Sequence, residues 1–203
     1  MSGGYLIPAD VARAELIIRR SRFVSAVQAA SSVADARAAI ATARDSMPDA
    51  NHHVYAFRVG FGNTVTEGMS DDGEPTGTAG PPTLAVLRGA GIGDIVIVTS
   101  RFFGGTKLGT GGLVRAYAEA AKQAIRSLKT ELKVEKKTLG LEMPYAHYNI
   151  VRRLIDGHNG KIEEEVFEAQ VLMIATFAVT DIDRFSADAR ERTAGLVSPV
   201  ELQ

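Results

Sequence analysis

Residues 70–112 read SDDGEPTGTAG, PPTLAVLRGAGIGDIVIVTS and RFFGGTKLGTGG in turn, which places two glycine-rich loops around one helix and one strand. Pro81 and Pro82 are tolerated best in a first helical turn, so a helix is predicted from there to Leu87 or Arg88. The β-branched run Ile95–Thr99 predicts a buried strand that leads into the second loop. Because glycine permits close approach to the backbone and helix starts carry free N–H groups, the two loops predict an anion-binding face.

The second loop supplies the candidate contacts to RNA or phosphate. It contains a lysine, follows an arginine, and precedes an amphipathic helix predicted from Leu113. It matches neither G-x-x-x-x-G-K-[ST] nor G-x-G-x-x-G, so the alternative is that its glycines only permit a tight connection between strand and helix. The candidate phosphate-binding residues are Arg101, Gly104, Gly105, Lys107, Gly109, Gly111 and Gly112.

Aromatic residues adjoin this loop. Phe102 and Phe103 follow Arg101 directly, and aromatic rings beside cations stack on the bases of single-stranded RNA. Strand alternation buries at least one of two consecutive side chains, so a role in the core is the favoured alternative for one of them.

The first loop contains three carboxylates, Asp71, Asp72 and Glu74. They either hold Mg²⁺, which takes oxygen ligands, or shape the loop by capping turns and by contacts with Arg101. The structural interpretation is favoured, and no metal is assigned with confidence. The two adjacent histidines cannot both bind one metal ion, because His52 and His53 are neighbours on a predicted strand and their side chains point to opposite faces.

The carboxy-terminal part of the chain has a different pattern. A charge-rich stretch, residues 129–137, predicts a domain boundary near residue 135, which divides the chain into 1–135 and 136–203. The order beyond it is that of a ferredoxin-like βαββαβ domain. The predicted elements are strand 138–143, helix 145–156, strand 161–167, strand 170–179, helix 182–192 and strand 196–202.

Composition narrows the classes of function. The 203 residues include 23 Lys and Arg against 24 Asp and Glu, so an electrostatic partner must be recognised locally. There is no cysteine, which removes disulfides and thiol catalysis. No signal peptide or membrane-spanning run is apparent, so the expectation is a cytoplasmic protein that does not bind membranes. The sequence does not indicate an oligomeric state.

The two loops together resemble the IMPACT family, and particularly its bacterial YigZ-like members. The resemblance rests on Ser70-Asp-Asp-Gly-Glu-Pro75, on Gly77-Thr-Ala-Gly80, and on the segment from Gly89 through Arg101-Phe-Phe-Gly-Gly-x-x-Leu-Gly109. The family motif of the first loop comprises Ser70, Gly73, Pro75, Gly77, Thr78 and Gly80.

The resemblance implies an α+β protein with two domains. The first would be like domain 2 of ribosomal protein S5, and the second like the last domain of elongation factor G. It also implies a non-enzymatic regulator of translation, active under stress, that binds ribosomal or transfer RNA or a ribosome-associated protein and needs no cofactor. The alternatives are a Mg²⁺-dependent enzyme acting on a phosphorylated small molecule, and an adaptor that binds only proteins.

Overall fold

A computed structural model describes residues 4–62 and 64–202 of the chain. The chain forms two compact units; Tyr5–Lys133 make up the first, and the second continues from Val134. Each unit combines helices with a sheet of antiparallel strands, which confirms the α+β class expected from the sequence. Within the two described ranges, no helix is long and apolar enough to cross a bilayer.

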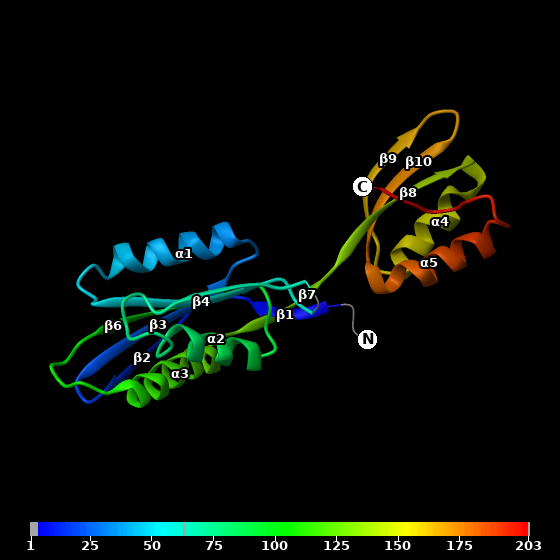
Figure 1. Cartoon of the computed structure of the whole chain (residues 1–203). Coiled ribbons are helices and arrows are strands. Elements are labelled where there is room, and N and C mark those ends of the chain that lie inside the picture. Colours follow the sequence, from blue (N-terminus) through cyan, green and yellow to red (C-terminus); the bar gives the residue numbers. More distant parts are fainter. Residues whose placement is uncertain (1–3, 63, 203) are drawn as a thin grey trace. The chain divides into compact units, whose positions relative to one another are not determined.

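A five-stranded antiparallel sheet forms the centre of the first unit, in the spatial order β2-β3-β6-β4-β5 (Figure 1). The middle strand, β6, is the apolar run that the sequence marks as buried, and seven of its eight residues are buried. The strands are β2 (Ala12–Ile18), β3 (Ser21–Ala29), β4 (His52–Val59), β5 (Thr66–Ser70) and β6 (Ile95–Phe102).

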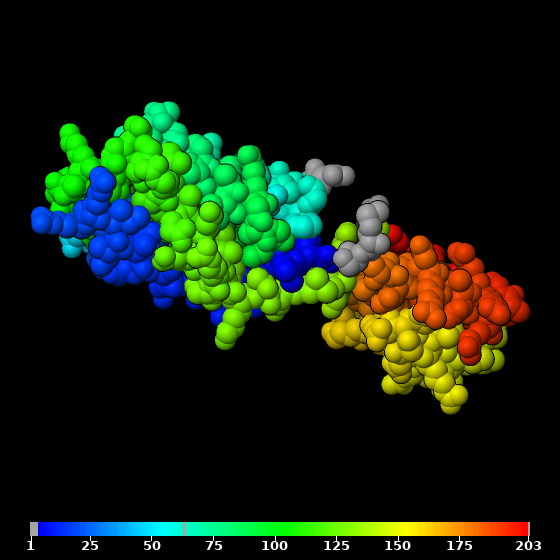
Figure 2. Space-filling view, turned by 90° about the horizontal axis from the view of Figure 1, so that it is seen from below, coloured from blue at the N-terminus to red at the C-terminus, as the bar shows by residue number. Residues whose placement is uncertain are grey.

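Helices cover both faces of this sheet. Helix α1 (Val33–Ser46) packs on one face, and helices α2 (Gly80–Gly89) and α3 (Thr110–Arg126) pack on the other (Figures 1 and 2). The start of α1 has a capping box, in which Ser32 Oγ accepts from the Asp35 amide at 3.1 Å and the Asp35 carboxylate accepts from the Ser32 amide at 3.0 Å.

The alternation of β6 separates two apolar cores. Val96 and Val98 pack beneath α1, whereas Ile95 and Ile97 pack beneath the opposite pair of helices. Each fully buried aliphatic side chain of this size contributes about 1.5–3 kcal/mol. The central strand therefore holds both helical layers in place, and the loop that follows it has a fixed starting point.

A short two-stranded sheet joins the two ends of the first unit. It pairs β1 (Gly4–Pro8) with β7 (Thr130–Val134), which lies inside the charge-rich stretch. The buried Asp94 ties both strands to the domain, because its carboxylate accepts from Tyr5 Oη at 2.8 Å and Lys133 Nζ at 2.5 Å. Burial acts to raise the pKa of Asp94, but Lys133, the Gly60 amide and Tyr5 outweigh it and lower that pKa.

The second unit is a four-stranded antiparallel sheet with two helices. Its spatial order, β11-β8-β10-β9, is the arrangement of a ferredoxin-like βαββαβ domain. Its apolar core lies between the sheet and both helices. The elements are β8 (Lys136–Met143), α4 (Tyr145–Gly157), β9 (Lys161–Phe167), β10 (Val171–Ala178), α5 (Val179–Arg192) and β11 (Val200–Glu201).

The predicted final strand, 196–202, was too long. Ala194 and Gly195 have positive φ values of 50° and 81°, and Leu196 is 62% exposed. Val197 packs into the core without pairing, so only Val200 and Glu201 join the sheet, opposite β8.

The boundaries around the second glycine loop also differ from the sequence prediction. β6 continues to Phe102, because Arg101 pairs with β4 and Phe102 pairs with β3. Helix α3 begins at Thr110, so Gly111 and Gly112 belong to its first turn. The connecting loop is therefore only residues 103–109.

Candidate anion-binding site at the start of helix α3

A groove of about 470 Å³ lies at the amino-terminal end of α3. It brings together residues from β4, β6, both glycine-rich loops and the first turn of the helix. Its lining residues are Asn51, His52, Glu74, Pro75, Arg101, Phe103, Lys107, Leu108, Gly109, Thr110 and Leu113. Four of the predicted phosphate or stacking residues, namely Arg101, Phe103, Lys107 and Gly109, thus share one cavity.

The amino terminus of α3 is open toward solvent. Gly109 occupies the N-cap position with φ of 73°, which favours glycine, and no side chain in the described chain caps the helix there. The first turn contains no acidic residue, and Leu113 is the first amide to bond back, to the Gly109 carbonyl. The amides of the preceding turn remain available at the positive end of the helix dipole, next to the exposed Lys107.

Arg101 is held inside the protein. Arg101 is only 5% exposed, and its Nη1 donates to both carboxylate oxygens of Glu74, at 2.7 and 3.0 Å. Its Nη2 donates to Ser21 Oγ at 3.2 Å, and its Nε has no partner among the residues that the structure describes. Glu74 therefore neutralises this guanidinium, and Arg101 acts as part of the groove wall instead of as a mobile surface cation.

Tyr117 of α3 completes this buried arrangement. Its hydroxyl donates to Glu74 Oε1 at 2.7 Å, and burial first, then the hydrogen bond to Glu74 and the charge of that carboxylate, raise the pKa of Tyr117. The hydroxyl therefore stays protonated and donates at physiological pH. His52 lies nearby, with Nε2 at 3.9 Å from Glu74 Oε1 and Nδ1 at 2.8 Å from the Asp72 carbonyl oxygen. Because a carbonyl only accepts, His52 Nδ1 carries a proton.

The other two acidic residues of the first loop are also engaged by protein groups. The Asp71 carboxylate accepts from the amides of Gly77, Ala79 and Gly80, at 2.8, 2.9 and 2.8 Å. Burial acts to raise the pKa of Asp71, but these three amides outweigh it and lower that pKa. The start of α2, which the sequence marks as a second anion site, is thus occupied by a carboxylate of the chain itself.

Asp72 faces a different set of partners. One carboxylate oxygen accepts from Arg44 Nη2 of α1 at 2.7 Å, and the other from the His53 amide at 2.7 Å. Within the described residues, no three histidine or acidic side chains are grouped so that they could hold a metal ion. Each of the three loop carboxylates thus accepts hydrogen bonds from groups of the chain itself.

The two phenylalanines have separate surroundings. Phe102 packs beneath Arg22, whose guanidinium carbon lies 4.1 Å from the ring centroid. Phe103 is 47% exposed at the groove, and its amide donates to Asn51 Oδ1 at 2.7 Å. Only Phe103 presents a ring surface to the groove.

The glycines of the second loop serve distinct purposes. At Gly104 an added Cβ would lie 2.0 Å from the Arg20 carbonyl oxygen, so the loop passes directly over the β2–β3 hairpin. Gly105 is exposed and lies outside the residues that line the groove. The sequence analysis did not identify Asn51 and Tyr117 as neighbours of this site, and it gave His52 no role there.

Comparisons with known proteins agree with this organisation. Residues 19–125 match the family model of the Impact N-terminal domain, and residues 141–196 match that of a domain of unknown function, DUF1949. An IMPACT family member from Haemophilus influenzae is 36% identical over 192 residues, covering 94% of this chain and 93% of that protein.

Two further relatives have similar coverage. The IMPACT family member YigZ from Escherichia coli is 36% identical over 192 residues, covering 94% of both chains. A solved structure, described as the crystal structure of a hypothetical protein, aligns with a TM-score of 0.73 and 34% identity over 100% of this chain and 99% of that one. The similarity therefore spans both units.

Proposed function

Because the chain belongs to the IMPACT family, we propose that it is a non-catalytic, translation-associated regulator that binds RNA at the groove beside α3. Family membership supports the translation-related role. The choice of RNA rests on the chemistry of the groove. Such a regulator acts in the cytoplasm, where translation takes place.

The observation that carries this proposal is the open start of α3 next to Lys107. Free amides at a helix start and a neighbouring ammonium group suit a phosphate, because both the hydrogen bonds and the dipole favour negative charge. Phe103 offers a partly exposed ring to the same groove, where an unpaired base adjacent to that phosphate stacks on it.

The buried residues of the groove have a supporting role in this proposal. Arg101 and Tyr117 both donate to Glu74, so they hold the end of β6 close to the middle of α3. Contact with the RNA falls to the α3 amides, Lys107 and Phe103. This division differs from the sequence-based expectation, which gave Arg101 a direct phosphate contact.

The test compares three single substitutions in the full chain by measuring affinity for a single-stranded RNA at several salt concentrations. We expect Lys107→Ala to reduce the slope of log affinity against log salt by about 0.7, the contribution of one phosphate contact to a single strand. We expect Phe103→Ala to weaken binding by about 1–3 kcal/mol, since one base loses its stacking partner.

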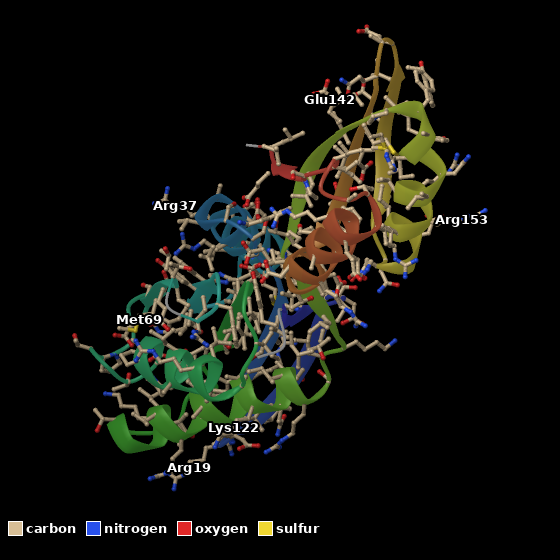
Figure 3. The ribbon with its side chains drawn as sticks, turned by 90° about the vertical axis from the view of Figure 1, so that its right-hand side faces the viewer. Arg19, Arg37, Met69, Lys122, Glu142 and Arg153 are labelled. Atoms are coloured by element: carbon tan, nitrogen blue, oxygen red, sulfur yellow. The ribbon has the colours of Figure 1, made fainter. Side chains whose placement is uncertain are left out.

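Arg37→Ala is the matched control. Arg37 is also an exposed cation, but it lies on α1, on the opposite face of the sheet from α3 and Lys122 (Figure 3). Its loss should leave the salt slope close to that of the parent protein. Equal effects of Lys107→Ala and Arg37→Ala would contradict a site at this groove, and salt-independent or absent binding would point to a ribosome-associated protein partner instead.

A further inference from the structure

A second groove of about 470 Å³ lies in the second unit, between helices α4 and α5. Three arginines from the two helices line it, namely Arg153, Arg184 and Arg192. All three side chains are exposed, and Figure 3 shows Arg153 projecting outward from α4. We call this feature the arginine groove.

The arginine groove has a net positive charge, because three arginines and one acid, Asp188, line it. None of the three guanidinium groups forms an ion pair with any residue that the structure describes. The acid in the groove, Asp188, is engaged instead by His158, whose Nε2 lies 2.8 Å from its carboxylate. The His158 ring packs edge-on against Phe185 at 5.8 Å, which holds this pair in place.

The spacing of the arginines suits an extended polyanion. Arg184 and Arg192 are eight residues apart on α5, which places them on one stripe about 12 Å apart along the helix axis. That length corresponds to the rise of roughly three to four stacked nucleotides at about 3.4 Å each. Across the groove, Gly157 has no side chain and leaves open space beside Arg153.

We propose that the arginine groove binds the phosphodiester backbone of a single-stranded RNA segment. Guanidinium groups bind phosphate oxygens in a bidentate fork, and Arg184 and Arg192 are spaced to contact phosphates about three to four nucleotides apart. No Phe, Tyr or Trp side chain lines the groove, and the His158 ring packs against Phe185, so the contacts of the groove read the backbone and not the bases. This inference rests on the proposed function for its ligand class, but it concerns a separate site on a separate unit.

The experiment measures binding of oligouridylate to the full chain as a function of salt. The variant Arg184→Gln with Arg192→Gln removes two positive charges from the groove, and Arg190→Gln with Arg37→Gln removes two from exposed positions outside it. We expect the salt slope to fall by about 1.4 in the groove variant, twice the value for one phosphate contact, and to change far less in the control.

A second variant, Arg184→Lys with Arg192→Lys, keeps the charge but removes the planar fork. Its affinity should lie between those of the parent and the glutamine variant. Suppose that the parent binds RNA and that Lys107→Ala weakens this binding. If the glutamine variant of the groove and its control then lose equal affinity for RNA, the arginine groove is refuted while the proposed function stands. No binding by the parent refutes both. Displacement of the RNA by polyglutamate of equal charge, with the same arginine dependence, would overturn RNA as the ligand.

Discussion

Substitution of Glu74 by glutamine tests whether the buried residues beside α3 stabilise the fold or bind the ligand. The side chains of Glu74 and Arg101 are 3% and 7% exposed, so Glu74→Gln leaves a guanidinium in the interior without its carboxylate. Removing one partner of a buried pair costs about 3–5 kcal/mol. That is a large share of the roughly 5–15 kcal/mol by which a domain is stable.

Urea unfolding followed by circular dichroism measures this loss. The chain has no tryptophan and forms two compact units, so hydrogen exchange of the β6 amides is used to identify the transition of the first unit. With a urea dependence of about 2 kcal/mol per molar, a loss of about 4 kcal/mol lowers the midpoint by about 2 M. Tyr117→Phe removes one hydrogen bond to the same carboxylate and should cost about 1.5–3 kcal/mol.

Glu119→Gln is the matched control for Glu74→Gln. Glu119 also pairs with an arginine, Arg126, at 3.4 Å, but the two side chains are 41% and 68% exposed. Exposed pairs contribute about 0–1 kcal/mol. The reasoning is refuted if Glu74→Gln unfolds at the same urea concentration as Glu119→Gln while RNA binding is lost, because the buried pair would then be part of the binding site.

Two further predictions concern the acidic residues that hold loops and strands. Asp71 has a lowered pKa, so its contribution to stability is present above its unfolded pKa of about 3.9 and is lost as pH falls through its folded pKa. Asp71→Asn should therefore lower Tm more at pH 7 than at pH 2, and a pH-independent difference in calorimetry would contradict this. Asp94→Asn removes the charge that holds Lys133. It should speed hydrogen exchange in β1 and β7 while leaving exchange in β6 unchanged. Unchanged exchange in β1 would show that Asp94 does not hold that strand.

Much of the fold follows from local sequence signals. The capping box of Ser32 and Asp35 places the start of α1, and the apolar run of β6 gives the central strand. The βαββαβ order of the second unit was also predictable, because its helices and strands have distinct periodicities. The β1–β7 pair was not, since every residue of β7 except Val134 is exposed and no alternation marks it as a strand.

The candidate site was predictable only in part. Glycine spacing and Lys107 direct attention to the loop before α3, and residues of that loop line a groove in the structure. The burial of Arg101 depends on Glu74 and Tyr117, which are 27 and 16 residues away from it and meet it only after β6 and α3 pack together. The sequence does not indicate the arginine groove, because its three arginines lie on two helices that are separated along the chain by two strands.

The pairing of β1 with β7 has a consequence for synthesis of the chain. β1 is made before every other strand that the structure describes, yet its partner is the last strand of the first unit. At the usual translation rate of about 5–20 residues per second, the roughly 125 residues between them take about 6–25 s to emerge. During that time β1 lacks its strand partner β7, although Leu6 can bridge to Ile92 once that residue has emerged, and the contact of Asp94 with Lys133 forms only when the first unit is fully synthesised.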